Sequence, residues 1–233
     1  MKISDRLQTC AGLVRQGNVA ADVGTDHGYL ALYLLQEGIC PRVYASDLRE
    51  GPLSAARRSA KQMGVYKNIT FRLSDGLSDL PMEEIDTVIL AGMGGETIIH
   101  ILEREPAVLV PEKQLILQPQ SKTPELRRWL AAHGFTVCRE VLSRDGKFLY
   151  TAMEAVYSGR RESLSPGREW MPETLLLSGE PLRKEYFARV KDSVRMSVEG
   201  MRRAKTPDPA LLAYYEMALR ELTEMEEAYD LGQ

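Results

Sequence analysis

The chain has 233 residues, enough for one α/β domain with a small second unit. Its hydrophobic content of 44%, charged content of 27% and net charge of −3 are ordinary for a soluble globular protein and do not announce a nucleic-acid partner. No apolar run is long enough to span a bilayer, and the first residues lack a signal-peptide pattern. The three cysteines are far apart and show no C-x-x-C spacing, which predicts reduced thiols in a cytoplasm and no metal site.

Residues 4–15 are predicted to form a first helix, with Ser4 as its N-cap. Beyond it, short apolar runs typical of strands alternate with helical patterns. The predicted strands are 19–23, 42–47, 69–73, 87–91 and 114–118, and the predicted helices are 29–37, 52–63, 96–103 and 124–133. Strands alternating with helices of this length predict a parallel sheet covered by helices on both faces.

Two further apolar segments, 135–142 and 148–156, follow one another without an intervening helix. The residues between them include Asp145-Gly146, a turn signal that predicts an antiparallel hairpin. Five parallel strands followed by such a hairpin make a seven-stranded, Rossmann-like sheet.

The composition changes after residue 158. Residues 159–180 are polar, contain Pro166-Gly167, and are predicted to connect the sheet domain (1–158) to a C-terminal unit (181–233). In that unit, apolar residues recur every three or four positions on either side of a break at 206–209. This pattern predicts an antiparallel helical hairpin with a coiled-coil-like seam.

The two predicted helices of the hairpin differ in charge. Residues 180–205 carry eight Lys or Arg against four acids, whereas residues 208–230 carry one Arg against seven acids. One interpretation is mutual electrostatic support across the hairpin. The other is a row that contacts RNA phosphates, for which the candidates are Arg189, Arg195 and Arg202.

The segment Asp22-Val23-Gly24-Thr25-Asp26-His27-Gly28 joins the first predicted strand to its helix. Such a turn is where α/β folds bind nucleotide-like ligands, because glycines let the backbone approach closely. The G-x-G-x-x-G pattern of a dinucleotide site is absent, and the carboxylates at Asp22 and Asp26 would repel phosphates. Carboxylates suit an ammonium, a sulfonium and ribose hydroxyls, and S-adenosylmethionine carries all three.

Two more acids follow the next strands. Asp47 is expected to accept ribose hydroxyls, and Asp75, followed by Gly76, is expected to accept an adenine amino group. Each acid taken alone is also explained as a helix cap or turn residue. The predicted donor-binding residues are Asp22, Gly24, Asp26, His27, Gly28, Asp47, Leu48, Asp75, Gly76, Ala91, Gly92 and Met93.

Substrate is expected beside the fourth and fifth strands. The glycines after the fourth strand, Gly94 among them, leave room for a flat base near the transferable methyl group, and Met93 is expected to form an apolar wall against that base. A tight strand-to-helix turn without a role in substrate binding is the alternative. Gln118 and Gln120 offer amides that can hydrogen-bond a base edge, although both are also explained as turn-capping residues.

The chain resembles the bacterial tRNA (adenine-N1)-methyltransferases of the TrmK type, which modify adenosine 22. The resemblance rests on Ala21–Leu30, Ala91–Gly95, Leu115–Gln120 and Glu140–Phe148, and it covers about residues 1–156. It implies a class I S-adenosylmethionine-dependent fold, a tRNA substrate and action as a monomer.

The resemblance also implies in-line attack of adenine N1 on the sulfonium methyl, with positioning supplying most of the acceleration. Asp26 is the first candidate, and Gln118 the second, to accept the adenine N6–H as positive charge grows on the ring. Two alternatives stay open: a methyltransferase of a small molecule, and a non-catalytic RNA module that binds S-adenosylmethionine.

Overall fold

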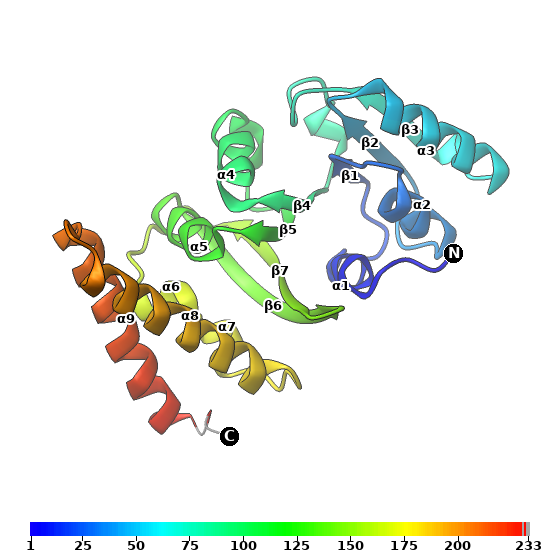
Figure 1. Ribbon diagram of the computed structural model, residues 1–233. Coiled ribbons are helices and arrows are strands. Elements are labelled where there is room, and N and C mark those ends of the chain that lie inside the picture. Colours follow the sequence, from blue (N-terminus) through cyan, green and yellow to red (C-terminus); the bar gives the residue numbers. More distant parts are fainter. Residues whose placement is uncertain (230, 232–233) are drawn as a thin grey trace.

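A seven-stranded sheet with the order β3-β2-β1-β4-β5-β7-β6 forms the centre of the molecule (Figure 1). The computed structural model describes residues 1–229 and 231. The strands are β1 (Ala20–Val23), β2 (Val43–Asp47), β3 (Ile69–Leu73), β4 (Thr87–Gly94), β5 (Gln114–Ser121), β6 (Phe135–Asp145) and β7 (Phe148–Tyr157). The first five run parallel, and β7 lies antiparallel between β5 and β6. The predicted sheet and its terminal hairpin are confirmed.

Helices cover both faces of this sheet (Figure 1). The α-helices are α1 (Asp5–Leu13), α2 (Tyr29–Gln36), α3 (Glu50–Gln62), α4 (Gly95–Glu103), α5 (Thr123–Ala132), α6 (Pro166–Trp170), α7 (Glu173–Leu176), α8 (Arg183–Arg203) and α9 (Pro209–Ala228). Three 3₁₀ turns are η1 (Tyr66–Asn68), η2 (Met82–Glu84) and η3 (Pro106–Val108). Ser4 caps α1 as predicted, because its hydroxyl accepts a hydrogen bond from the Leu7 amide.

The side chains of the central strands alternate between two hydrophobic clusters, one on each face of the sheet. Val88 and Leu90 of β4 pack into the cluster that contains α4 and α5, whereas Ile89 between them packs into the cluster of α1 and α2. Successive side chains of a strand point to opposite faces, so an unbroken apolar run is what a sheet buried on both sides requires. Among the described residues, no helix is both long and apolar enough to cross a membrane.

The strand β4 is longer than the sequence predicts. It continues past Ala91 to Gly94, with a register irregularity opposite β5 between Ala91 and Met93. Gly92 has φ +80°, a left-handed conformation that places the extra residue of a bulge. The residues between the predicted strand and the predicted helix are therefore a bulged strand end.

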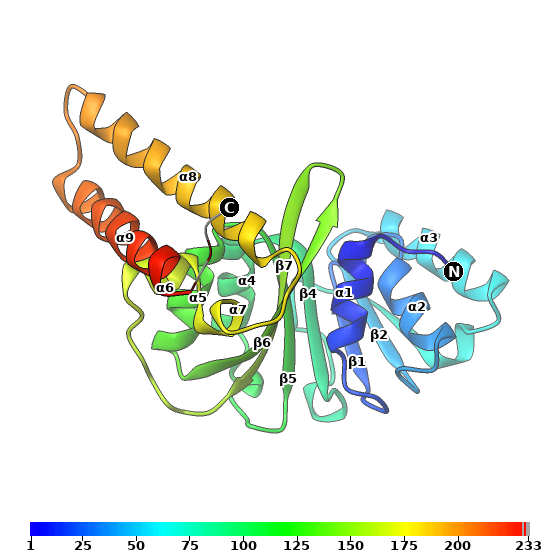
Figure 2. The same cartoon turned by 90° about the horizontal axis from the view of Figure 1, so that it is seen from below.

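The C-terminal helices α8 and α9 form the expected antiparallel hairpin, which extends away from the sheet (Figure 2). Its seam buries Phe187 and Val194 of α8 against Ala218 and Leu222 of α9. Leu142 of β6 belongs to the same cluster, as do Met171 and Leu175 to Leu176 of the segment 159–180. That segment is thus packed between the sheet and the hairpin through α6 and α7. Residues 230, 232 and 233 of the predicted C-terminal unit lie outside the described residues.

Candidate functional site

The turn from β1 to α2 has an unusual backbone. Gly24, Asp26 and Gly28 adopt left-handed φ values of +70°, +51° and +76°. A Cβ on Gly24 would lie 2.4 Å from Met93 Cε, and one on Gly28 would lie 2.7 Å from Ala56 Cβ. Both glycines are therefore required by backbone conformation and by close approach.

Asp22, at the end of β1, is a buried carboxylate that lacks a compensating cation. Its side chain is 4% exposed and accepts a 2.6 Å hydrogen bond from the Thr25 hydroxyl. Burial raises the pKa of Asp22 to about 6, an effect that the Thr25 hydrogen bond opposes and the charge of Asp47 reinforces. A cation placed nearby would lower this pKa toward its ordinary value and so favour the ionised form.

Asp47 joins the ends of β1 and β2. Its buried carboxylate accepts hydrogen bonds from the backbone N–H of Asp26 at 3.2 Å and of Arg49 at 2.9 Å. The acid therefore holds the strained Asp26 backbone in place. The side chain of Asp26 itself remains exposed, with His27 Nε2 3.7 Å from its Oδ1.

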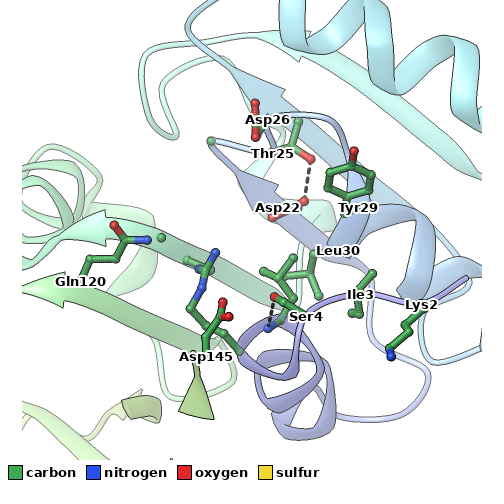
Figure 3. A pocket seen from close by; sticks show the side chains of 15 residues that line it. Lys2, Ile3, Ser4, Asp22, Thr25, Asp26, Tyr29, Leu30, Gln120 and Asp145 are labelled. Carbon is green, nitrogen blue, oxygen red and sulfur yellow. Dashed lines mark hydrogen bonds between the residues drawn. The ribbon is translucent and has the colours of Figure 1, made fainter. Parts of the chain in front are cut away.

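A cavity of about 620 Å³ opens at the carboxyl ends of β1 and β4 (Figure 3). Asp22, Thr25 and Asp26 lie on one side of it, and Gln120 and Asp145 lie on the other. It is lined by Lys2, Ile3, Ser4, Arg6, Leu7, Asp22, Gly24, Thr25, Asp26, Tyr29, Leu30, Ala91, Gly92, Gln120 and Asp145. The cavity size matches that of small-molecule sites in proteins.

Arg6 of α1 is a cavity residue that the sequence analysis did not single out. Its Nη1 donates a 2.7 Å hydrogen bond to Gln118 Oε1, which also accepts from the Gly92 amide at 3.0 Å. Gln118 is fully buried, and its Nε2 donates to the Pro119 carbonyl at 3.0 Å. Gln118 therefore holds two lining residues of the cavity in place, Arg6 and Gly92 of the β4 bulge. The sequence of α1 is that of an ordinary helix that covers a sheet, so Arg6 can be recognised as a cavity residue only from its contact with Gln118 in the folded chain.

Several predicted site residues lie outside the cavity lining. Asp75 is exposed and pairs with Arg104 of α4, whose Nη1 lies 2.8 Å from Asp75 Oδ2. Gly76 packs against the Ile101 side chain, and Leu48 is 68% exposed. Their expected contacts with the donor stay predictions. Met93 is not among the lining residues, but its Cε lies next to the lining residue Gly24, at the position that a Cβ there would need.

The candidate arginines of the helical hairpin all have acidic partners. Arg189 pairs with Glu185 at 2.8 Å and Arg195 with Asp192 at 2.9 Å, both within α8. Arg202 reaches across to Glu216 of α9 at 2.7 Å. Of these three pairs, only that of Arg202 supports the interpretation of electrostatic support across the hairpin, and the pair of Lys191 with Glu226 of α9 adds a second such contact. Exposed pairs contribute only about 0–1 kcal/mol, so the same guanidinium groups can exchange a carboxylate for a phosphate. The described part of the chain contains no group of three or more side chains suited to a metal ion.

Comparison with known proteins gives consistent matches. A family described as a methyltransferase domain matches residues 3–153. A Bacillus subtilis protein named tRNA (adenine(22)-N(1))-methyltransferase is 37% identical over 195 residues, which cover 83% of this chain and 78% of the relative.

Two crystal structures resemble the whole chain. The B. subtilis M1A22 tRNA methyltransferase TrmK has a TM-score of 0.79 at 28% identity, over 100% of this chain and 99% of that one. A Streptococcus pneumoniae protein in complex with S-adenosyl-L-methionine has a TM-score of 0.81 at 26% identity, over 96% of this chain and 99% of that one. The similarity thus includes the C-terminal helices as well as the sheet.

Proposed function

Because the chain belongs to the tRNA (adenine(22)-N(1))-methyltransferase family, we propose that it methylates N1 of adenosine 22 in tRNA, with S-adenosylmethionine as donor. The observation that carries this proposal is the buried, cation-free carboxylate of Asp22 at the floor of a 620 Å³ cavity. The protein would act as a monomer in the cytoplasm, where tRNA is modified.

The residues at the cavity fit this donor. S-adenosylmethionine, when bound, supplies an electrophilic methyl group on a cationic sulfur. Asp22 and Asp26 give the cavity wall the negative charge that a ligand with an ammonium and a sulfonium requires. Gly24 adopts a left-handed φ of +70°, which a residue with a side chain rarely takes, and Met93 Cε occupies the position of its missing Cβ, so Gly24 fixes the shape of the turn that borders the cavity. Asp47 holds the turn from behind and is the candidate for the ribose hydroxyls.

Adenine N1 has a free lone pair, so no general base is needed before it attacks. The chain must instead orient the base and stabilise the positive charge that develops on its ring. Asp26 is the first candidate for this role, and the position of its exposed carboxylate in the cavity lining supports it as an acceptor for the N6–H. Gln118 is buried and holds Arg6 and the Gly92 amide, so its role is to position the cavity wall.

Adenine N1 lies on the Watson–Crick edge, so a paired or stacked target must leave its helix before transfer. Arg195 and Arg202 of α8 would hold the tRNA through phosphates and shape. Met93, Gly94 and Gln120 are the candidates for contact with the extracted base.

The test is incubation with labelled S-adenosylmethionine and a tRNA transcript, followed by nucleoside analysis for 1-methyladenosine. A transcript with guanosine at position 22 is the matched substrate control, and Asp22→Asn is the matched protein control. We expect 1-methyladenosine with the unaltered pair, none with guanosine at position 22, and a lower rate with Asp22→Asn when S-adenosylmethionine is limiting. Methylation of metabolites but not of tRNA would favour the small-molecule alternative, and donor binding without transfer would favour the RNA-binding module.

A further inference from the structure

The turn between β6 and β7 presents an aromatic side chain to solvent beside the cavity. Phe148, the first residue of β7, is 55% exposed, and its ring centroid lies 6.3 Å from that of Tyr150. Asp145, which pairs with Phe148 in the hairpin, lines the cavity. The hairpin rises past the ends of its neighbouring strands, between α1 and α8 (Figure 2). An aromatic pair thus stands at the mouth of the candidate active site.

A cation accompanies each of these rings. Lys147 Nζ lies 5.3 Å from the Phe148 centroid, and Arg6 Cζ lies 5.8 Å from the Tyr150 centroid. Arg6 also lines the cavity and donates to Gln118. The row Lys147, Phe148, Tyr150 and Arg6 therefore runs from the hairpin tip to the cavity wall. Aromatic faces interleaved with cations are what single-stranded nucleic acid binds, through base stacking and phosphate contacts.

The tip is held in place by the helical hairpin. Arg189 of α8 donates a 2.6 Å hydrogen bond from Nη1 to the Lys147 carbonyl, and Arg144 pairs with Glu185 of the same helix. These contacts fix the turn before any ligand arrives. A rigid aromatic contact loses little conformational entropy on binding, which makes it an effective anchor.

We propose that Phe148 and Tyr150 form a stacking platform for an unpaired base of the RNA substrate next to the target nucleotide. The inference rests on the proposed function, because extraction of a base uncovers the face of its neighbour. The platform would cover that face, while Lys147 lies where the adjoining phosphate would pass. Loss of base–aromatic stacking typically weakens binding by roughly tenfold.

The chain contains a matched control at the opposite edge of the sheet. Tyr66 of η1 is 42% exposed, with Lys61 Nζ 5.1 Å from its centroid and the Phe71 ring 6.1 Å away. This trio has the same composition as Lys147, Phe148 and Tyr150. Tyr66, however, lies in the turn that precedes β3, at the amino end of a parallel strand, and no member of the trio lines the cavity.

The experiment measures initial rates of tRNA methylation against tRNA concentration for Phe148→Ala, Phe148→Trp, Phe148→Leu and Tyr66→Ala. We expect Phe148→Ala to raise the KM for tRNA about tenfold, with kcat within about twofold, and Phe148→Trp to restore it. Phe148→Leu should not restore it, because leucine supplies apolar area without a flat face. Tyr66→Ala should match the unaltered protein, and calorimetry should give the same S-adenosylmethionine affinity for all variants.

Several outcomes would overturn the platform alone. These are an unchanged KM in Phe148→Ala, full rescue by leucine, an equal effect of Tyr66→Ala, or a parallel loss of donor affinity. A melting temperature for each variant separates loss of RNA contact from loss of folding. If the unaltered protein transfers no methyl group to tRNA, the proposed function fails, and the platform fails with it.

Discussion

Asp22 and Glu140 are both buried carboxylates of one sheet, but their surroundings are opposite. Glu140 of β6 accepts hydrogen bonds from Arg127 at 2.7 Å, from Thr151 at 2.9 Å and from Thr174 at 3.2 Å. Asp22 of β1 faces a cavity, with the Thr25 hydroxyl as donor and Asp47 as a neighbouring negative charge. The first acid is satisfied by its own chain, and the second is left for a ligand to satisfy.

The difference follows from what each region must do. Arg127 also donates to the carbonyls of Glu169 and Trp170 and to the Tyr186 hydroxyl, so one guanidinium joins α5, β6, α6 and α8. Burial alone would lower the pKa of Arg127, but the charge of Glu140, the Tyr186 hydroxyl and the hydrogen bonds to both together outweigh burial and raise that pKa. This junction is a brace, whereas the carboxyl end of β1 keeps a buried carboxylate without a cation partner, at a cost in stability.

Breaking the brace should have the largest effect. Arg127→Leu leaves the Glu140 charge buried without its partner, so we expect a loss of about 3–5 kcal/mol in the free energy of unfolding. The double variant Arg127→Leu/Glu140→Leu removes both charges and should recover much of this loss. Urea unfolding followed by circular dichroism measures both. A double variant no more stable than the single one would contradict the account of Glu140.

Neutralising Asp22 should stabilise the folded protein but weaken its binding of S-adenosylmethionine. Asp22→Asn retains an acceptor for Thr25 but loses the negative charge, so S-adenosylmethionine affinity should fall at least about tenfold, the scale of a hydrogen bond to a charged group. Asp47→Asn tests the neighbouring acid in the same titration. Isothermal calorimetry that gives equal affinities for the unaltered protein and Asp22→Asn would remove Asp22 from the donor site.

The pH dependence of stability sharpens the same comparison. The folded-state pKa of Asp22, about 6, lies above its ordinary value of 3.8, so the folded state holds a proton that the unfolded state has lost between these values. Its contribution is favourable below about pH 4 and is lost as the pH rises through 6, by about 3 kcal/mol in total. Asp22→Asn lacks this loss, so it should gain stability relative to the unaltered protein from pH 4 to pH 8. If the difference in free energy of unfolding between Asp22→Asn and the unaltered protein were the same at all pH values, this prediction would be wrong.

The smallest effects on stability are expected on the exposed face of α8. Arg202→Ala breaks the pair with Glu216 and should change the free energy of unfolding by no more than about 1 kcal/mol. If Arg202 contacts a phosphate, the same change should weaken tRNA binding and reduce the salt slope by about 1. Arg57→Ala in α3, which breaks an exposed pair with Glu50, is the matched control. The measurement is tRNA affinity at several salt concentrations. Equal slopes of log affinity against log salt concentration for both variants would exclude a phosphate contact at Arg202.

Local pattern was sufficient to predict most of the fold. The strand 69–73 has the predicted limits, and the helices of the sheet domain differ from prediction by one or two residues at their ends. Each of these elements carries its own periodicity. The β4 bulge was missed because it depends on the pairing of Gly92 and Met93 with β5, which no local pattern encodes.

The candidate site divides in the same way. Asp22, Gly24 and Asp26 follow one strand directly, so the sequence places them together. Arg6 and Asp145 come from the first helix and the last hairpin, and only the folded chain brings them to the same cavity. The sequence also does not predict the short helices α6 and α7, because segments of five and four residues are too short to show a helical periodicity.

The hydrogen bond between Arg6 and Gln118 also has a consequence for biosynthesis. The two residues are 112 positions apart, so the wall they share cannot close until most of the sheet has left the ribosome. When only the first βαβ unit has left the ribosome, the nascent chain already contains Asp22 and Asp47. It still lacks Gln118, the hydrogen-bond partner of the Arg6 guanidinium. The cavity that we propose for the methyl donor is therefore complete only in the late stages of synthesis, when the adjoining strands are in place.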